Sequence, residues 1–216
     1  MAEISCVIVA CSKSAYHRQI TNNAIASCGV DSLVVETFSK VPYKVKTLFW
    51  NTDFNYNACL NYGILNTDSE YIALCNNDLV FIKGWESIIE TMKRYEVMSA
   101  CPFSEYSSHR HGYKADGTVH FGYQVGSEML GWCIVVHRDI FSIIGKLDET
   151  YSFWCSDNAY ADQLQSHRLK HLLDCGSIVN HIRGESKTLN TLTRSQYHRY
   201  TIEQYNNYVT AKRNRA

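Results

Sequence analysis

The chain has 216 residues, of which 45% are hydrophobic and 19% are charged. This length and composition predict one globular domain and exclude a disordered or fibrous protein. Because 21 Lys and Arg residues balance 21 Asp and Glu residues, the chain as a whole is not a polybasic nucleic-acid binder.

The first hundred residues alternate between short apolar runs and segments with helical periodicity. Apolar runs rich in β-branched residues predict buried strands, and apolar spacings of three and four predict helices. The predicted strands cover residues 4–12, 32–38, 44–51, 70–78 and 96–103, and the predicted helices cover 15–29, 55–68 and 84–96. Strand–helix–strand units imply right-handed crossovers between parallel strands. This pattern predicts an α/β fold with a mostly parallel central sheet flanked by helices.

The second half of the chain is less regular. Residues 104–127 are rich in Gly, His and Tyr and lack a sustained apolar period, which predicts a long functional loop or an irregular hairpin. Further strands are predicted at 129–138 and 177–182, and helices at about 157–171 and 194–216. We therefore expect a single domain over 1–216, with a first half of about 1–100, a second half of about 101–190 and a basic, Tyr-rich C-terminal helix at 191–216.

The cysteines and the N-terminus indicate the compartment. The nine cysteines are odd in number, lie mostly in apolar runs and show no C-x-x-C pair, which predicts reduced, mostly buried thiols in a cytosolic protein. The N-terminal segment MAEISCVIVACSKS has no basic region, and no apolar run approaches the roughly 20 residues of a membrane helix. We expect a soluble, cytoplasmic protein without membrane insertion.

Polar side chains follow four of the predicted strands. In open α/β sheets, ligands bind beyond the carboxyl ends of the strands. The residues at these ends are Cys11 and Ser12, Glu36, the triplet Asn76, Asn77 and Asp78, and His181. No Gly-rich loop follows the first strand, which disfavours a dinucleotide-binding or P-loop protein. If a diphosphate binds at this edge, a divalent cation is the expected counterion.

Several segments resemble, in the correct order, a family 2 glycosyltransferase with the GT-A fold. The nucleotide-sugar half of that family is similar to CVIVA, VVET, NTDFNYNACLNYGI and YIALCNNDLVF. Its second half is similar to IIGKLDETYSFWCSDNAYADQL and to NHIRGESKT. The resemblance runs from about residue 4 to about residue 190. It implies a metal-dependent, inverting transfer of a sugar from a nucleotide diphosphate, UDP being the expected nucleotide, to a hydroxyl acceptor.

The resemblance assigns the metal to the strand-end triplet and the closing histidine. Asp78 is the expected ligand, Asn76 a secondary one, and His181 a further one. Asn76 and its neighbour Asn77 are also expected to contact the donor. Such oxygen and imidazole ligands suit Mg²⁺ or Mn²⁺. The residues alone leave another interpretation open, in which Asp78 caps a turn and His181 is a core histidine.

The resemblance also assigns contacts with the donor. Cys11 and Ser12 end the first strand beside it, and Glu36 matches an acid that bonds the base or ribose. Asn57 and Asn61 lie four residues apart on one helical face and match a helix that faces the donor. Each of these residues also fits an ordinary structural role, as a strand-end carboxylate or a solvated helix position.

Catalysis and acceptor binding are assigned to the second half. Asp157 matches the carboxylate that deprotonates the acceptor, although an Asp there also suits a helix N-cap. Asp148 and Glu149 are expected to shape the acceptor loop. Trp132 and Trp154 are candidate stacking surfaces for a sugar or base, or core residues.

The acceptor stays open between a saccharide and a hydroxymethylated base in DNA. A saccharide is the common acceptor of the family. The basic, Tyr-rich tail and the loop residues His109, Arg110 and His111 have the composition of a nucleic-acid groove, as in a phage-type enzyme that flips out a base. The tail equally fits a solvated helix. Two further classes also remain, a nucleotidyltransferase-like enzyme and a non-catalytic nucleotide-sugar-binding module.

Overall fold

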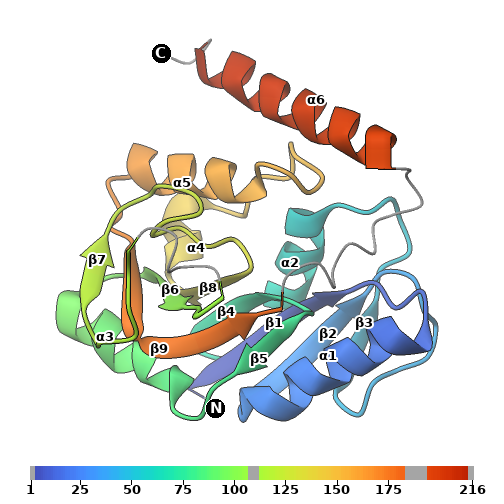
Figure 1. The fold of residues 1–216 in the computed structure, drawn as a ribbon, viewed down its shortest axis with the longest axis horizontal. Coiled ribbons are helices and arrows are strands. Elements are labelled where there is room, and N and C mark those ends of the chain that lie inside the picture. Colours follow the sequence, from blue (N-terminus) through green and yellow to red (C-terminus); the bar gives the residue numbers. More distant parts are fainter. Residues whose placement is uncertain (1–2, 107–111, 183–193, 214–216) are drawn as a thin grey trace.

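The computed structural model describes residues 3–106, 112–182 and 194–213 (Figure 1). The predictions made for His109, Arg110 and His111, and for the part of the closing motif beyond Ile182, lie outside the described residues.

A nine-stranded sheet forms the centre of the molecule (Figure 1). Its order is β3-β2-β1-β4-β8-β6-β9-β5, and β7 pairs with β9. The strand bounds are β1 Ile4–Ala10, β2 Asp31–Glu36, β3 Lys46–Phe49, β4 Tyr71–Asn76, β5 Leu79–Phe81, β6 Ser99–Phe103, β7 Val119–Phe121, β8 Cys133–His137 and β9 Leu172–His181. Strands β1 and β4 are buried at nearly every position, as their continuous apolar sequences predicted.

The strand directions bring distant parts of the chain to one edge of the sheet. Strands β3, β2, β1 and β4 are parallel, as predicted. Strand β8 is antiparallel to both β4 and β6, and β9 is parallel to β6. Because β4 and β6 are both antiparallel to β8, they run in the same direction, and β9, which is parallel to β6, also runs in that direction. The carboxyl ends of β4 and β9 and the amino end of β8 therefore lie at the same edge.

Helices cover both faces of the sheet (Figure 1). The helices are α1 Ala15–Cys28, α2 Tyr56–Ile64, α3 Ile88–Tyr95 after the 3-10 turn η1 Trp85–Ser87, α4 Ile140–Ile144, α5 Ser156–Ser166 and α6 Arg194–Arg213. Helix α2 packs so closely that a Cβ on Gly63 would lie 2.2 Å from Val7 Cγ1. A side chain there would push α2 outward, and so Gly63 sets the distance between α2 and the sheet.

Several boundaries differ from the predicted ones for local reasons. The predicted strand over 129–138 begins only at Cys133, because the preceding residues turn and the Cys133 N–H donates to Leu130 O (3.1 Å). The helix predicted to reach 171 ends at Ser166, since Arg168 has a left-handed φ of 56°. Strands β5 and β7 have three residues each, too few for an apolar pattern to reveal.

All nine cysteines are free, and eight of them are buried, with Cys11 partly exposed. This agrees with the predicted buried thiols. Within the described part of the chain, no helix combines the length and the apolar character that crossing a bilayer requires.

Candidate functional site

Asp78 and His181 meet at the carboxyl edge of the sheet. Asp78 follows β4, His181 ends β9, and the antiparallel pairing of β5 with β9 sets Leu79 opposite His181. The Ile182 N–H donates to Asp78 O (3.0 Å), which ties the two segments together. His181 Nε2 lies 3.2 Å from Asp78 Oδ1, and Asp78 is fully buried. The backbone pairing therefore fixes a carboxylate against an imidazole.

The segment before β8 joins this pair to the start of α5. The Trp132 ring stacks on the His181 ring, with centroids 5.5 Å apart and planes 20° apart. Trp132 O also accepts a hydrogen bond from the Asn76 N–H (2.9 Å). On the other side, a Cβ on Gly131 would lie 2.8 Å from Asp157 Oδ2. Trp132 thus contacts His181, and its neighbour Gly131 contacts Asp157.

Asp157 is the second residue of α5, and its surroundings disfavour the charged form of its carboxyl group. Its Oδ1 accepts a hydrogen bond from the Asn158 N–H (2.9 Å), and the residue is half-buried. Burial raises the pKa of Asp157 above its ordinary value. The N-cap residue of α5 is Cys155, with φ 64° and no side-chain cap. The alternative interpretation of Asp157 as the N-cap is therefore wrong.

The Asp78–His181 pair has the spacing of two ligands of one metal ion. Two ligands on adjacent corners of an octahedron, with bonds of about 2.1 Å, lie about 3.0 Å apart. The observed 3.2 Å between Oδ1 and Nε2 is close to this value. The described residues hold no group of three or more His, Cys, Asp or Glu that could bind a metal.

Glu36 is satisfied by the chain itself. It is 1% exposed, and its Oε1 accepts hydrogen bonds from the N–H groups of Ser12 (3.0 Å), Phe38 (2.9 Å) and Ser39 (3.0 Å). Its Oε2 accepts from the Tyr43 hydroxyl (2.9 Å). Glu36 was predicted to bond the base or ribose of a donor. Its visible contacts instead fold the loop after β2 against the end of β1, beside the carboxyl edge.

The other strand-end residues differ in their surroundings. Cys11 is partly exposed, whereas Ser12 is buried and hydrogen-bonds the Tyr43 hydroxyl. Asn76 is partly exposed at the end of β4. Asn77, also predicted to contact the donor, is buried and donates to Thr21 Oγ1 on α1 (3.0 Å). Its amide therefore anchors α1 to the strand end, and its contact with a donor stays a prediction.

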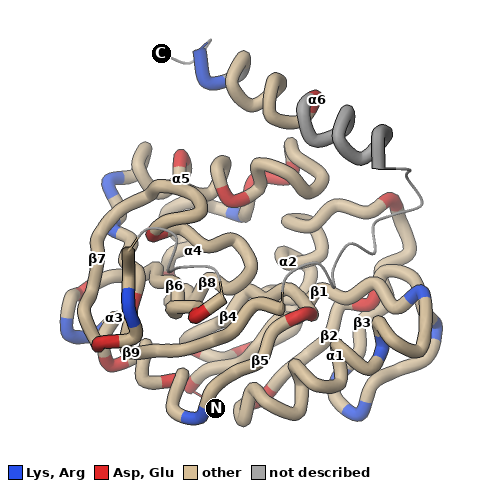
Figure 2. Tube along the Cα trace, in the orientation of Figure 1, with Lys and Arg blue, Asp and Glu red and all other residues tan. Residues whose placement is uncertain are grey.

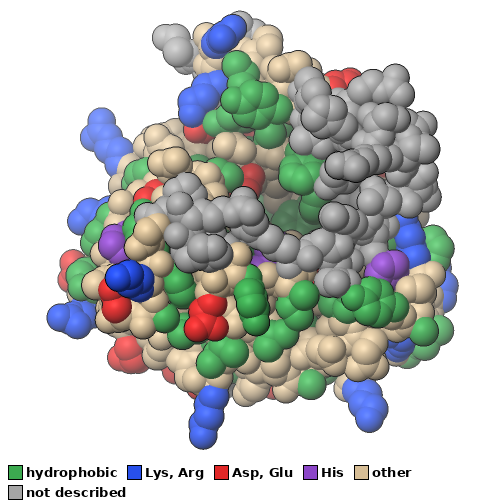
Figure 3. All heavy atoms as spheres, in the orientation of Figure 1, with side chains coloured by type: hydrophobic (Ala, Val, Ile, Leu, Met, Phe, Trp, Pro, Cys, Tyr) green, Lys and Arg blue, Asp and Glu red, His purple; other side chains and the backbone are tan. Residues whose placement is uncertain are grey.

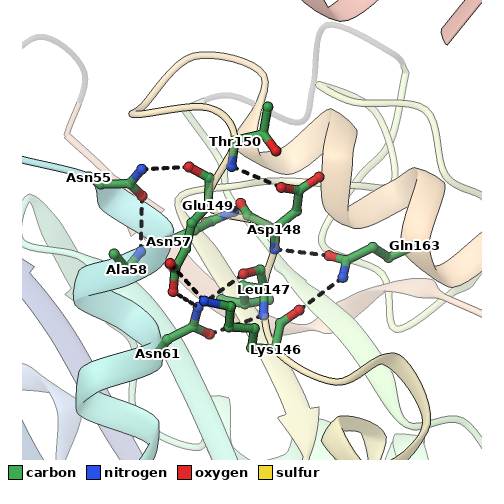
Figure 4. A network of polar contacts seen from close by, with 10 residues as sticks. All are labelled: Asn55, Asn57, Ala58, Asn61, Lys146, Leu147, Asp148, Glu149, Thr150 and Gln163. Atoms are coloured by element: carbon green, nitrogen blue, oxygen red, sulfur yellow. Dashed lines mark hydrogen bonds and ion pairs between the residues drawn. The ribbon is translucent and has the colours of Figure 1, made fainter. Parts of the chain in front are cut away.

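Asn57 and Asn61 hold the segment 146–150 (Figure 4). Asn57 Nδ2 donates to Asp148 O (2.7 Å), and Asn61 Nδ2 donates to Leu147 O (3.0 Å) and Glu149 Oε1 (2.8 Å). The Leu147 N–H donates back to Asn61 Oδ1 (3.0 Å). Both asparagines were predicted to face the donor; the network shows their contacts with this loop, and a contact with a donor stays a prediction. A repeat of four residues places two amides on one helical face but does not say what that face contacts.

Asp148 and Glu149 belong to the same network. Asp148 Oδ1 accepts from the Thr150 N–H (2.8 Å), and Glu149 Oε2 pairs with Lys146 Nζ (2.8 Å). The Lys146 and Asn61 contacts lower the pKa of Glu149. These carboxylates belong to a hydrogen-bonded loop, and their predicted role at an acceptor stays a prediction. On the other side, Gln163 of α5 contacts Asp148 and Lys146 (Figure 4), so α2 and α5 clamp this loop between them.

We expect Asn61→Ala to destabilise the protein by about 3 kcal/mol, because it leaves the buried N–H and C=O of Leu147 without partners. Urea unfolding followed by circular dichroism measures this change. The control is Asn66→Ala, which removes one bond to Tyr62 O (2.9 Å) and should cost less than about 1 kcal/mol. Equal losses of stability in Asn61→Ala and Asn66→Ala would contradict the role of Asn61 in holding the loop 146–150.

Trp154, just before α5, packs outside the main hydrophobic core. It contacts Phe153 edge to face, with ring centroids 5.2 Å apart, and packs in a small cluster with Tyr151, Cys155 and Ala159. Tyr208 of α6 packs against the same cluster. This position favours the packing role over the stacking role for Trp154. Trp132, in contrast, lies at the site against His181.

The surface is hollowed on the face below α6. Figure 3 shows hydrophobic and acidic side chains inside this hollow. In Figure 2, acidic positions gather along α5 and the loop before it, while Lys and Arg lie mostly at the periphery. An anionic diphosphate near these carboxylates would be repelled unless a cation accompanied it. The charge distribution thus agrees with a metal-assisted site.

The order of the strands and the helices on both faces form a GT-A-like α/β fold. Among solved structures, the chain is similar to the mannosyltransferase PcManGT from Pyrobaculum calidifontis in complex with GDP-Man and Mn²⁺, with a TM-score of 0.60 and 8% identity. The match covers 85% of this chain and 59% of that chain. At this identity the likeness shows the fold alone, because one fold supports many functions.

No protein-family model and no curated protein matches the chain in sequence. Membership of family 2, which the motifs led us to expect, therefore stays a prediction.

One residue beside the site carried no signal in the sequence. Tyr56, the first residue of α2, is 7% exposed and lines a small cavity together with Gly131 and Asp157. An aromatic residue at the start of an apolar helix is indistinguishable from an ordinary core residue, and only the structure separates it from the other fourteen tyrosines.

Proposed function

We propose that the protein transfers a sugar from a nucleoside-diphosphate donor to a hydroxyl group of an acceptor. The observation that carries this proposal is the Asp78–His181 contact of 3.2 Å at the carboxyl edge, joined to Asp157 through Gly131 and Trp132. The GT-A-like fold and a structural neighbour that holds GDP-Man and Mn²⁺ support it. UDP, expected from the sequence, and GDP are the two donor nucleotides to be distinguished.

Asp78 and His181 would hold a divalent ion, Mn²⁺ or Mg²⁺. Their donor chemistry fits, since a carboxylate oxygen and an imidazole nitrogen bind Mn²⁺ well and a carboxylate binds Mg²⁺. When bound, such an ion supplies positive charge that stabilises the departing diphosphate. With Asn76 as the strand-end neighbour and the loop held by Glu36 beside it, the chain offers a place for the donor nucleotide.

Asp157 would act as the catalytic base. Its raised pKa makes the carboxylate a better proton acceptor than an exposed Asp. It removes the proton of the acceptor hydroxyl as that oxygen attacks the anomeric carbon from the side opposite the leaving diphosphate. Inversion at that carbon follows from this single displacement. The loop 146–150 and Trp132 would line the acceptor side.

A saccharide acceptor has more support than DNA. The described part of the basic helix α6 binds to α5: the Tyr208 hydroxyl donates to Asp162 Oδ2 (3.0 Å), and Lys212 Nζ donates to Asp162 Oδ1 (2.8 Å). A lysine and a tyrosine that were candidates for phosphates and bases thus have partners within the chain. These contacts leave fewer cationic and aromatic groups of α6 for the phosphates and bases of a DNA acceptor.

Calorimetric titration of UDP-, GDP- and dTDP-sugars with Mn²⁺ tests the proposal. We expect one of these donors to bind, EDTA to weaken that binding by at least about tenfold, and the bound donor to be hydrolysed slowly. Binding without hydrolysis would indicate a non-catalytic module. Release of pyrophosphate from a nucleoside triphosphate and a sugar phosphate would indicate a nucleotidyltransferase. Absence of binding to all three donors would overturn the proposal.

A further inference from the structure

Tyr56 is held rigidly at the start of α2. Asn55 caps this helix by accepting a hydrogen bond from the Ala58 N–H (3.0 Å), and the Tyr56 N–H donates to Ser152 O (2.7 Å). The Tyr56 ring packs edge to face on Phe153, with centroids 5.8 Å apart and planes at 90°. The side chain therefore has one well-defined position beside the loop that leads into α5.

The hydroxyl group of Tyr56 lacks a hydrogen-bond partner among the described residues, although it is buried. Buried hydroxyl groups in folded proteins are almost always bonded to protein or to ordered water. Burial, followed by nearby acidic groups that include Asp78 and Asp157, raises the pKa of Tyr56 well above its ordinary value. The group thus keeps its proton and is available as a donor.

A small cavity adjoins Tyr56 and Asp157. Its volume is about 20 Å³, and its lining includes Tyr56, Gly131, Asp157, Ser156 and Tyr160. This volume holds one water molecule, which needs two or more polar partners. Oδ1 of Asp157 already accepts from the Asn158 N–H, whereas Oδ2 lies 2.8 Å from the position that a Cβ on Gly131 would take. Glycine at position 131 therefore leaves room for the Asp157 carboxylate to lie against it beside the cavity.

We propose that Tyr56 is a positioning residue for Asp157: its hydroxyl donates a hydrogen bond to one water molecule in this cavity, and that water donates to the Asp157 carboxylate. The bridge fixes the direction of the carboxylate and favours its charged form, opposing the effect of burial. Its role in turnover rests on the proposed function, in which Asp157 is the base. The water bridge itself does not depend on the proposed function.

Other ionisable groups near Asp157 do not replace this donor. Cys101 of β6 and Cys155 before α5 are within electrostatic range of Asp157, and burial raises the pKa of both thiols, that of Cys155 to about 11. Both are neutral at physiological pH. Among these groups, Tyr56 alone supplies a strong donor.

The test is Tyr56→Phe, which removes one oxygen atom and keeps the ring. In protein labelled with ¹³C at Asp carboxyl carbons, the signal of Asp157 is assigned with Asp157→Asn and titrated with pH. We expect the pKa of Asp157 to rise by about one unit in Tyr56→Phe. Tyr62→Phe, on the exposed side of the same helix with Tyr62 37% exposed, should leave that pKa unchanged. An unchanged pKa in Tyr56→Phe overturns the proposal.

A high-resolution crystal structure of the unaltered protein keeps the test independent of how the variant folds. We expect one ordered water within hydrogen-bond distance of Tyr56 Oη and an Asp157 carboxylate oxygen. A cavity closed by packing, or a water bonded to only one of them, overturns the proposal.

Measurements of turnover distinguish a failure of the water bridge from a failure of the proposed function. With an active donor and acceptor, Tyr56→Phe should lower kcat about tenfold with little change in the KM for the donor. If Asp157→Asn retains turnover while the titration shift is present, the base assignment fails and the bridge stands. If Asp157→Asn loses turnover but the shift is absent, the bridge fails and the base assignment stands.

Discussion

Asp78→Asn is expected to abolish metal-dependent binding of the sugar nucleotide. The substitution replaces one carboxylate oxygen by an amide of the same size, so the packing of this fully buried residue is retained. It removes the negative charge that faces His181 Nε2 at 3.2 Å. Because loss of a residue that only supports a metal ligand already costs about 10- to 100-fold in metal affinity, we expect Asp78→Asn to weaken Mn²⁺-dependent donor binding by at least about 100-fold.

The measurement is calorimetric titration of the donor at fixed Mn²⁺, together with electron paramagnetic resonance of free Mn²⁺. Asp68→Asn serves as the matched control, since Asp68 is exposed and precedes the amino end of the same strand, β4. It should bind donor and Mn²⁺ as the unaltered protein does. Equal binding by Asp78→Asn and the unaltered protein would remove the metal site from the proposal and leave the Asp78–His181 pair as a structural ion pair.

The elements that the sequence predicts well are those that bury a continuous apolar run. Strand β4 reads Tyr-Ile-Ala-Leu-Cys-Asn and is buried until its last residue, so its end, and therefore the place of Asp78, follows from the apolar pattern. His181 was placed at a strand end in the same way. That the two side chains meet depends on the direction of β9, which the pattern does not contain. The meeting was expected only through the resemblance.

The contacts of the polar side chains were harder to predict. Asn57 and Asn61 lie on one helical face, as their spacing says, but that face contacts the loop 146–150 rather than open space. Such pairings join residues far apart in the chain, and no local pattern encodes them. The role of Tyr56 could not be predicted from the sequence either, because whether a buried hydroxyl group has a hydrogen-bond partner depends on the packed structure. Polar residues at strand ends thus indicate where a site lies more reliably than they indicate each residue's role.

The start of α5 explains why Asp157, and not its acidic neighbours, is suited to accept a proton. Asp148 and Glu149 have partners in the loop network, and Asp162 is paired with Lys212 and Tyr208. Asp157 Oδ1 accepts from the Asn158 N–H, and burial raises the pKa of Asp157. A base with a raised pKa is active only above that pKa, so kcat should fall on the acid side at a pH above the ordinary Asp range.

Asp157→Asn should therefore lower kcat by about 10²- to 10⁴-fold, the usual contribution of a general base, while donor affinity stays near normal. An amide at this position keeps the size of the side chain and the bond from Asn158, but it cannot take a proton at neutral pH. Steady-state kinetics with the donor found in the titrations gives kcat and KM separately. Asp162→Asn on the same helix is the control. It breaks surface contacts with α6 and should leave kcat within about a factor of two. Turnover retained by Asp157→Asn would mean that another group removes the proton, and the half-buried carboxylate at the start of α5 would then have to be explained by binding of the acceptor alone.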